Sequence, residues 1–238
     1  MLIDAAKYDF RELNEKIHEA DGDVIINNCN GQRFIGSGLE KIKITINGTP
    51  GNALGAYLDG AEITVNANAQ DAVGDTMNTG KIVVHGNIGD AVGYAMRGGE
   101  IYIKGDAGYR AGIHMKEYKD KSPVMVIGGK CGSFLGEYQA GGKIIVLGLR
   151  YDSQTVGYFC GTGMHGGKIY LRGNNENIKL PRQVSINPAS KSDMKEISRY
   201  IDEFCKLFNE DKQEILSEKF YVITPDSSNP YKQMYVEN

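Results

Sequence analysis

The sequence contains no tryptophan, no long apolar run and no excess of basic residues. A membrane-spanning helix needs about 20 mostly apolar residues, and the opening MLIDAAKYDF has neither a basic region nor an apolar signal core. The net charge of −3 offers no positive field for nucleic acid. These absences predict a cytoplasmic protein whose partners include neither membrane nor nucleic acid.

Cysteine is scarce and scattered. Cys29, Cys131, Cys160 and Cys205 form no Cys-x-x-Cys pair. This spacing lacks a zinc or redox motif and suits free thiols in a reducing compartment. We therefore expect neither disulfides nor a metal site in this chain.

Of the 31 glycines, 30 lie between Gly31 and Gly173, and none follows Gly173. Such a boundary indicates one architectural unit, since average glycine usage is only about 7%. We expect this unit at 31–175, preceded by a cap of helix and first strand at 1–30. An extended segment and a helix should follow at 176–238.

Both flanks of the glycine-rich block show helical periodicity. Phe10, Leu13 and Ile17 share one face of a helix at 9–20, and Asp9 and Glu12 have the spacing of a capping box. A second helix is expected at 192–210, where the apolar residues at helical spacing are Met194, Ile197, Ile201, Phe204 and Phe208. We expect both helices to dock on the ends of the block.

Inside the block, Gly55, Gly74, Gly93 and Gly112 stand nineteen residues apart. The units that begin at residues 52, 71 and 90 keep one register, and each carries an alternating apolar pair. These pairs form two columns, Ile63, Ile82 and Ile101, and Val65, Val84 and Ile103. Each unit therefore predicts a short strand with one buried face.

Later units keep this pattern after one interruption. The fourth unit retains Gly112, then carries a polar insertion at 114–123 before its strand resumes. Units with Gly136 and Gly157 follow, and a less regular unit stands at 31–51. The count is six or seven units.

A period near twenty residues is compatible with leucine-rich repeats, left-handed hexapeptide helices or right-handed β-helices. The units hold little leucine, and their apolar residues do not recur every six positions. We therefore predict an all-β fold, a right-handed parallel β-helix of about six to seven coils with flanking helices. Its corners need glycine for positive φ angles, so Gly74→Val should disrupt a coil.

The segments at 51–86, 107–116 and 136–148 are GNALGAYLDGAEITVNANAQDAVGDTMNTGKIVVHG, AGYRAGIHMK and GEYQAGGKIIVLG. In order and spacing they resemble the GXGXG domain that ends the large subunit of glutamate synthase. The resemblance covers about residues 24–173.

This resemblance implies a structural β-helix without catalytic residues or a cofactor of its own. The chain has Leu2 after Met1, so it lacks the family's N-terminal cysteine nucleophile, and it has no cysteine cluster for an iron–sulfur centre. The resemblance thus implies a free-standing scaffold, a component of an oxidoreductase. Its expected partners are glutaminase and synthase polypeptides, the latter with FMN and an iron–sulfur cluster, or further copies of the chain.

Two alternatives stay open. The repeats are also similar to the β-helical subunit of formylmethanofuran dehydrogenase, a non-catalytic scaffold in another redox complex. An independent ligand-binding protein or enzyme is the other interpretation, but outward positions such as Thr64, Val83 and Tyr102 offer no catalytic carboxylates on the solvent face.

Two groups of residues are candidates for chemistry or recognition. Cys160 and His165 could form a nucleophile and base, although a core thiol is the more common role. The insertion is either a solvated loop or a subunit contact, and its charged residues and histidine are His114, Lys116, Glu117 and Lys119.

Other motifs have structural interpretations. The glycine segments 86–93 and 161–167 recur with the coil period without a following helix, which argues against a phosphate-binding loop. Asp71 and Asp90 share one column and are expected to accept hydrogen bonds from backbone amides at corners. Five tyrosines near corners either line an interface or cover the helix body, namely Tyr57, Tyr94, Tyr109, Tyr138 and Tyr158.

Overall fold

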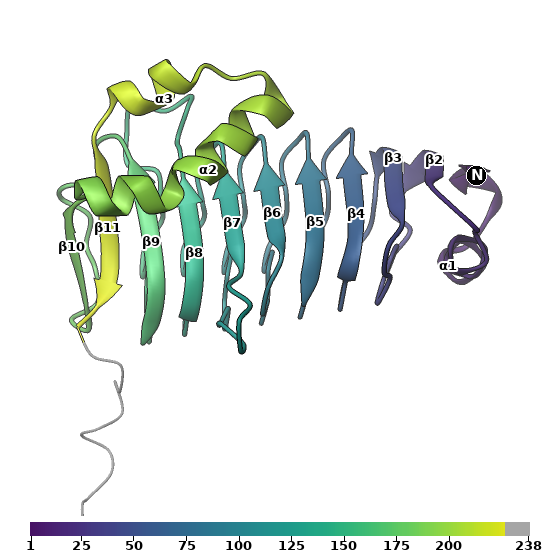
Figure 1. Cartoon of the computed structure of the whole chain (residues 1–238), viewed down its shortest axis with the longest axis horizontal. Helices are drawn as coiled ribbons and strands as arrows, with labels where there is room; N and C mark the ends of the chain where they lie inside the picture. Colours follow the sequence, from purple (N-terminus) through teal and green to yellow (C-terminus); the bar gives the residue numbers. More distant parts are fainter. Residues whose placement is uncertain (227–238) are drawn as a thin grey trace, which may run out of the picture.

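The computed structural model describes residues 1–226, which wind into a stack of parallel strands (Figure 1). The strands β2 to β9 follow one another in chain order, and each pairs in parallel with its neighbours in the chain. Their bounds are β2 Val24–Asn30, β3 Lys43–Thr49, β4 Asp59–Val65, β5 Thr79–Val84, β6 Glu100–Ile103, β7 Val124–Ile127, β8 Ala140–Val146 and β9 Gly166–Arg172. The predicted all-β fold, a parallel β-helix, is confirmed.

The stack holds about eight coils, so the predicted count of six to seven was slightly low. The strand that raises the count is β2, which pairs in register with β3 through Val24 and Ile44. A further short strand, β1 Leu2–Asp4, pairs with β2 at the N-terminal edge. A first strand was expected within the cap at 1–30, where β2 lies, but it was not counted as a coil because no corner glycine of the repeat precedes it.

The two predicted apolar columns form internal ladders. Ile63 pairs with Ile82 and Ile82 pairs with Ile101, and all three side chains are fully buried. The first column extends through the whole stack as Val24, Ile44, Ile63, Ile82, Ile101, Met125, Ile144 and Ile169. Each coil adds one side chain to this column, so the core grows with the number of coils.

Gly74 shows why a corner requires glycine. Its φ is +69°, and Ala72 and Thr76 on either side also have positive φ angles of 55° and 52°. Gly74 differs from these neighbours because it faces the core: a Cβ at this position would lie 2.5 Å from Cδ1 of Ile101. The corner glycine thus combines a left-handed backbone with a close approach to the ladder.

The N-terminal end of the stack is covered by a helix, as predicted. The helix α1 Phe10–His18 follows the short helix η1 Ala5–Lys7 and lies against the end of the stack (Figure 1). Asp9 and Glu12 form the expected capping box. Leu13 and Ile17 pack into the core.

Strands, rather than a helix, cover the C-terminal end. The strand β11 Phe220–Pro225 pairs antiparallel with β9, and β10 Val184–Pro188 pairs antiparallel with β11. The expectation that the second flanking helix docks on this end was therefore wrong. Antiparallel pairing satisfies the backbone groups of β9, which a docked helix would leave unpaired.

The second helix, α2 Lys191–Phe208, instead crosses the outer face of the later strands (Figure 1). Ile201 and Phe204 are buried there against Val83 and Tyr102, which are only 4% and 1% exposed. These two outward positions of the coils were expected at the solvent face, and the structure corrects this because the helix covers them. No helix within residues 1–226 is long and apolar enough to cross a membrane.

Ion pairs link the polar side of α2 to β8 and β9. Lys168 Nζ donates to Asp193 Oδ1 at 2.9 Å and to Glu196 Oε2 at 2.7 Å, and Lys143 lies 3.2 Å from Glu196. The Ser190 hydroxyl, with Lys168, lowers the pKa of Asp193 from 3.8 to about 2. After α2, the short helix α3 Lys212–Ser217 leads to β11.

This network predicts a specific acid sensitivity. A carboxyl whose pKa is depressed on folding stabilises the protein above its unfolded pKa, so the contribution of Asp193 should be lost as pH falls from about 4 to about 2. Asp193→Asn should lower the free energy of unfolding by about 1–2 kcal/mol at neutral pH. It should also reduce the loss of stability that the wild type shows between about pH 4 and about pH 2. Urea unfolding at a series of pH values measures both effects. Asp120→Asn, which changes an exposed loop residue, should keep the pH dependence of the wild type. If it lost stability as Asp193→Asn does, the acid sensitivity could not be attributed to Asp193.

Candidate partner-binding surface

Aromatic side chains gather on one corner of the later coils. We call this set the aromatic corner, and its members are Tyr94, His114, Phe134, Tyr138, Tyr158 and Phe159. The Phe134 and Phe159 rings stack with centroids 5.0 Å apart, and the His114 and Tyr138 rings stack at 5.1 Å. Tyr158 and Phe159 are 71% and 56% exposed. Clustered exposed aromatic residues are typical of protein interfaces.

The backbone explains why these rings face outward. His114 and Phe159 have φ angles of 56° and 61°, like other residues two positions before or after a corner glycine. Arg110 reinforces the arrangement, because its guanidinium lies 5.0 Å from the centroid of the Phe134 ring and pairs with Glu137 at 3.2 Å. The rings are therefore held in place on a rigid coil. Among the five tyrosines noted in the sequence, this corner contains Tyr94, Tyr138 and Tyr158, whereas Tyr57 and Tyr109 are exposed elsewhere on the corners.

A depression of about 420 Å³ lies beside the stacked His114 and Tyr138 rings. We call it the basic hollow. Its lining residues are Tyr94, Ala95, Arg97, His114, Lys116, Tyr138, Ala140 and His165. Two cations and two imidazoles thus converge on one shallow surface.

The inserted loop folds back on the coils beside this hollow. Tyr118 and Lys121 exchange backbone hydrogen bonds of 3.0 Å, which close a tight turn. Lys121 also lies 3.7 Å from Asp59, and a Cβ on Gly141 would collide with Glu117. Of the loop residues singled out in the sequence, His114 and Lys116 line the hollow, whereas Glu117 and Lys119 do not.

Cys160 and His165 do not form a nucleophile–base pair in this structure. Cys160 is 1% exposed within the core, and burial raises the pKa of its thiol to about 12. His165 lines the surface hollow, where its Nδ1 lies 3.0 Å from the carbonyl oxygen of Gly163. Since thiolate is the reactive form, this geometry supports the interpretation of Cys160 as a core residue.

The polar corner residues form ladders of hydrogen bonds. Asp71 Oδ1 accepts from the Asp90 amide at 2.9 Å, and Asp90 Oδ1 accepts from the Tyr109 amide at 2.7 Å. Asn87 Oδ1 accepts in the same way from the Asp106 amide at 2.9 Å. The prediction that these aspartates bind backbone amides is confirmed. Within residues 1–226, no three His, Cys, Asp or Glu side chains are grouped to hold a metal ion.

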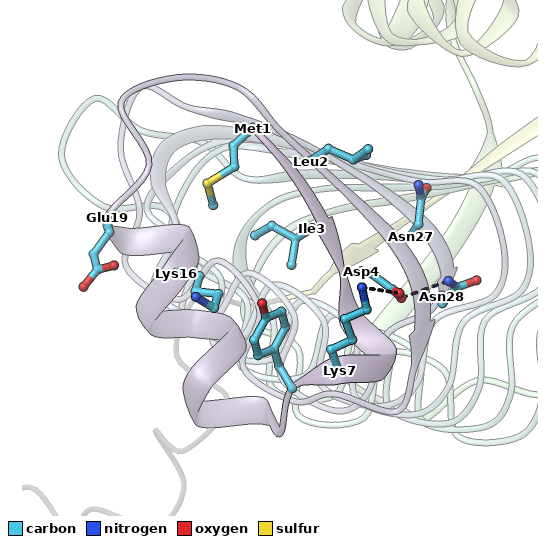
Figure 2. Close-up of a pocket in the computed structure, with 10 residues that line it drawn as sticks. Met1, Leu2, Ile3, Asp4, Lys7, Lys16, Glu19, Asn27 and Asn28 are labelled. Atoms are coloured by element: carbon cyan, nitrogen blue, oxygen red, sulfur yellow. Dashed lines mark hydrogen bonds and ion pairs between the residues drawn. The ribbon is translucent and has the colours of Figure 1, made fainter.

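A larger hollow, about 600 Å³, lies at the N-terminal end between β1 and α1 (Figure 2). Asn28 donates to Asp4 at 2.9 Å and Lys7 lies 3.7 Å from the same carboxylate, so the pKa of Asp4 is lowered. Lys16 points over the Tyr8 ring, with its Nζ 4.8 Å from the centroid. These groups interact with one another, and the hollow is best described as a crevice between β1 and α1, the elements that cover the N-terminal end of the stack.

Sequence reasoning missed Arg97 as a site residue. The repeat carried the signal, because Arg97, Lys116 and His165 all stand four residues after a corner glycine, namely Gly93, Gly112 and Gly161. Following this column across the coils would have placed the three side chains on one face.

Comparisons with known proteins agree with the fold. A family model described as "GXGXG motif" matches residues 12–226. "Uncharacterized protein MJ1350" of Methanocaldococcus jannaschii is 46% identical over 250 residues, which cover 99% of this chain and 96% of that protein.

A solved structure has a similar chain. It is the formyltransferase/hydrolase complex (FhcABCD) from Methylorubrum extorquens in complex with methylofuran. The two chains superpose with a TM-score of 0.65 and 21% identity, over 79% of this chain and 69% of that one. At this identity the likeness shows a shared fold.

Proposed function

The chain belongs to the GXGXG motif family, and we propose that it is a non-catalytic scaffold subunit that assembles with glutaminase and synthase polypeptides in glutamate synthesis. The aromatic corner carries this proposal. It combines two stacked ring pairs, each with one exposed and one half-buried ring, with a rigid coil, which suits a surface that positions other proteins. In this proposal the partners hold the FMN and the iron–sulfur cluster, and the assembly is cytoplasmic.

A second candidate is a β-helical scaffold in a formylmethanofuran dehydrogenase or another redox complex. The observation in its favour is the fold shared with a chain of the formyltransferase/hydrolase complex. Both candidates use the same rigid rod and differ in the proteins that it holds.

Affinity purification of the tagged chain from its own organism tests the proposal. We expect a flavoprotein and a glutaminase to co-purify with the wild type, and Tyr158→Ser with Phe159→Ser to reduce their recovery about tenfold. Tyr57→Ser is the matched control, because Tyr57 is also exposed, at 59%, but stacks on no other ring in residues 1–226. Recovery of formyltransferase or dehydrogenase subunits would favour the second candidate, and a chain that purifies alone would contradict both.

A further inference from the structure

The basic hollow places like charges on neighbouring coils. The amide of Lys116 donates to the carbonyl of Met96, the residue before Arg97, so the two cations occupy one column on successive coils. The amide of His165 donates to the carbonyl of Gln139, the residue before Ala140, which continues the column. Hydrogen-bonded coils in such a stack lie about 4.8 Å apart, so Arg97 and Lys116, which both stand outside the strands, are direct neighbours.

Neither cation has a carboxylate partner within residues 1–226. The nearby acidic groups are engaged elsewhere: Glu137 pairs with Arg110, and Glu117 accepts from Ser122. The Nε of Arg97 is buried and also lacks a hydrogen-bond partner. Like charges on adjacent coils repel each other, and a buried unpaired donor adds to the cost.

The shape of the hollow supplies room for the missing partner. Ala140 stands in the column between Lys116 and His165, so one coil contributes only a methyl group. One side is lined by His114 and Tyr138, whose rings stack nearly parallel at 9°. An oxygen-rich anion would fit the space beside the Ala140 methyl group. This space is surrounded by Arg97, Lys116 and the imidazole of His165.

We propose that the basic hollow binds an oxyanion, that is, a carboxylate or phosphate group. The guanidinium of Arg97 matches such groups through paired N–H donors, and Lys116 adds a second positive charge. The oxyanion belongs either to a free small molecule or to an acidic segment of a bound protein. The site is a property of the chain alone, so it does not depend on which complex the chain joins.

Binding to the purified chain tests the site without any partner protein. Inorganic phosphate, succinate and a capped tetraglutamate peptide are titrated at constant ionic strength, and NMR follows the His114 and His165 ring signals. We expect saturable binding, with a dissociation constant that rises at least about tenfold in Arg97→Gln and in Lys116→Gln. Lys195→Gln removes an exposed charge on α2 and should leave the affinity unchanged.

Thermal unfolding without added anion separates a binding role from a structural one. Because Arg97 and Lys116 repel each other, each glutamine variant should raise the Tm by about 1–3 °C while losing stabilisation by the anion. Saturation by phosphate or succinate identifies a small-molecule site, and saturation by the peptide alone identifies an acidic protein segment. The proposal is overturned if no probe saturates, if Lys195→Gln weakens binding equally, or if both variants lower the Tm with unchanged affinity.

Discussion

Replacing Gly74 with alanine is expected to destabilise the protein by roughly 3–4 kcal/mol, through backbone strain and steric overlap together. Gly74 has a φ of +69°, and the added Cβ would lie 2.5 Å from Cδ1 of Ile101. Gly38→Ala is the matched control, since Gly38 has a φ of +68° and no atom within 4 Å of its added Cβ. That variant should lose only about 1 kcal/mol, because it carries the backbone strain alone.

A second substitution tests whether the overlap with the ladder causes the loss at Gly74. Ile101→Val removes Cδ1, the atom that the new methyl group meets, and leaves Cγ1 as the next contact at 3.6 Å. The double variant Gly74→Ala with Ile101→Val should therefore be less destabilised than the sum of the two single variants, by about 1–2 kcal/mol in urea unfolding. Equal losses for Gly74→Ala and Gly38→Ala, or strict additivity of the double variant, would contradict the explanation.

The internal ladder could be predicted from sequence because it follows directly from the repeat. Ile63, Ile82 and Ile101 stand nineteen residues apart, and a fixed period fixes the register of a stack. The coil of β2 was left out of the count, and its strand was assigned to the cap at 1–30, because no corner glycine of the repeat precedes it. The strand itself, with Val24 and Ile26 alternating, carried a weaker signal than the repeat.

The position of α2 could not be predicted from its own amphipathic pattern, which reveals an apolar face but not what covers it. The strands hold the missing information. The column of outward residues is threonine at Thr45 and Thr64 and changes to apolar or aromatic residues from Val83 and Tyr102 onward. This change marks where the helix begins to cover the coils.

The candidate site was only partly predictable for a similar reason. The inserted loop drew attention to His114 and Lys116 because it breaks the period. Arg97 and Phe134 keep the period, so nothing in their own coil distinguishes them. Their importance depends on what stands at the same position of the adjacent coils, Lys116 for Arg97 and Phe159 for Phe134.

The loss of Phe204 should weaken the attachment of α2 to the coils. Phe204 is fully buried and packs at 4.8 Å, edge to face, against Phe208. Gly128 makes space for the ring, because a Cβ there would lie 2.8 Å from Cζ of Phe204. Phe204→Ala should therefore cost about 3–5 kcal/mol, the usual range for a buried phenylalanine that leaves a cavity.

The solenoid architecture determines how this loss is observed. Coils contact mainly their neighbours, so α2 can detach while the internal ladder stays intact. In Phe204→Ala, amide hydrogen exchange should accelerate throughout α2 before it changes in β4 and β5, and the uncovered Tyr102 and Tyr170 should bind a hydrophobic dye. Lys206→Ala, an exposed position two residues later, should retain wild-type exchange. Uniform acceleration across all strands would instead show that α2 and the coils unfold as one cooperative unit.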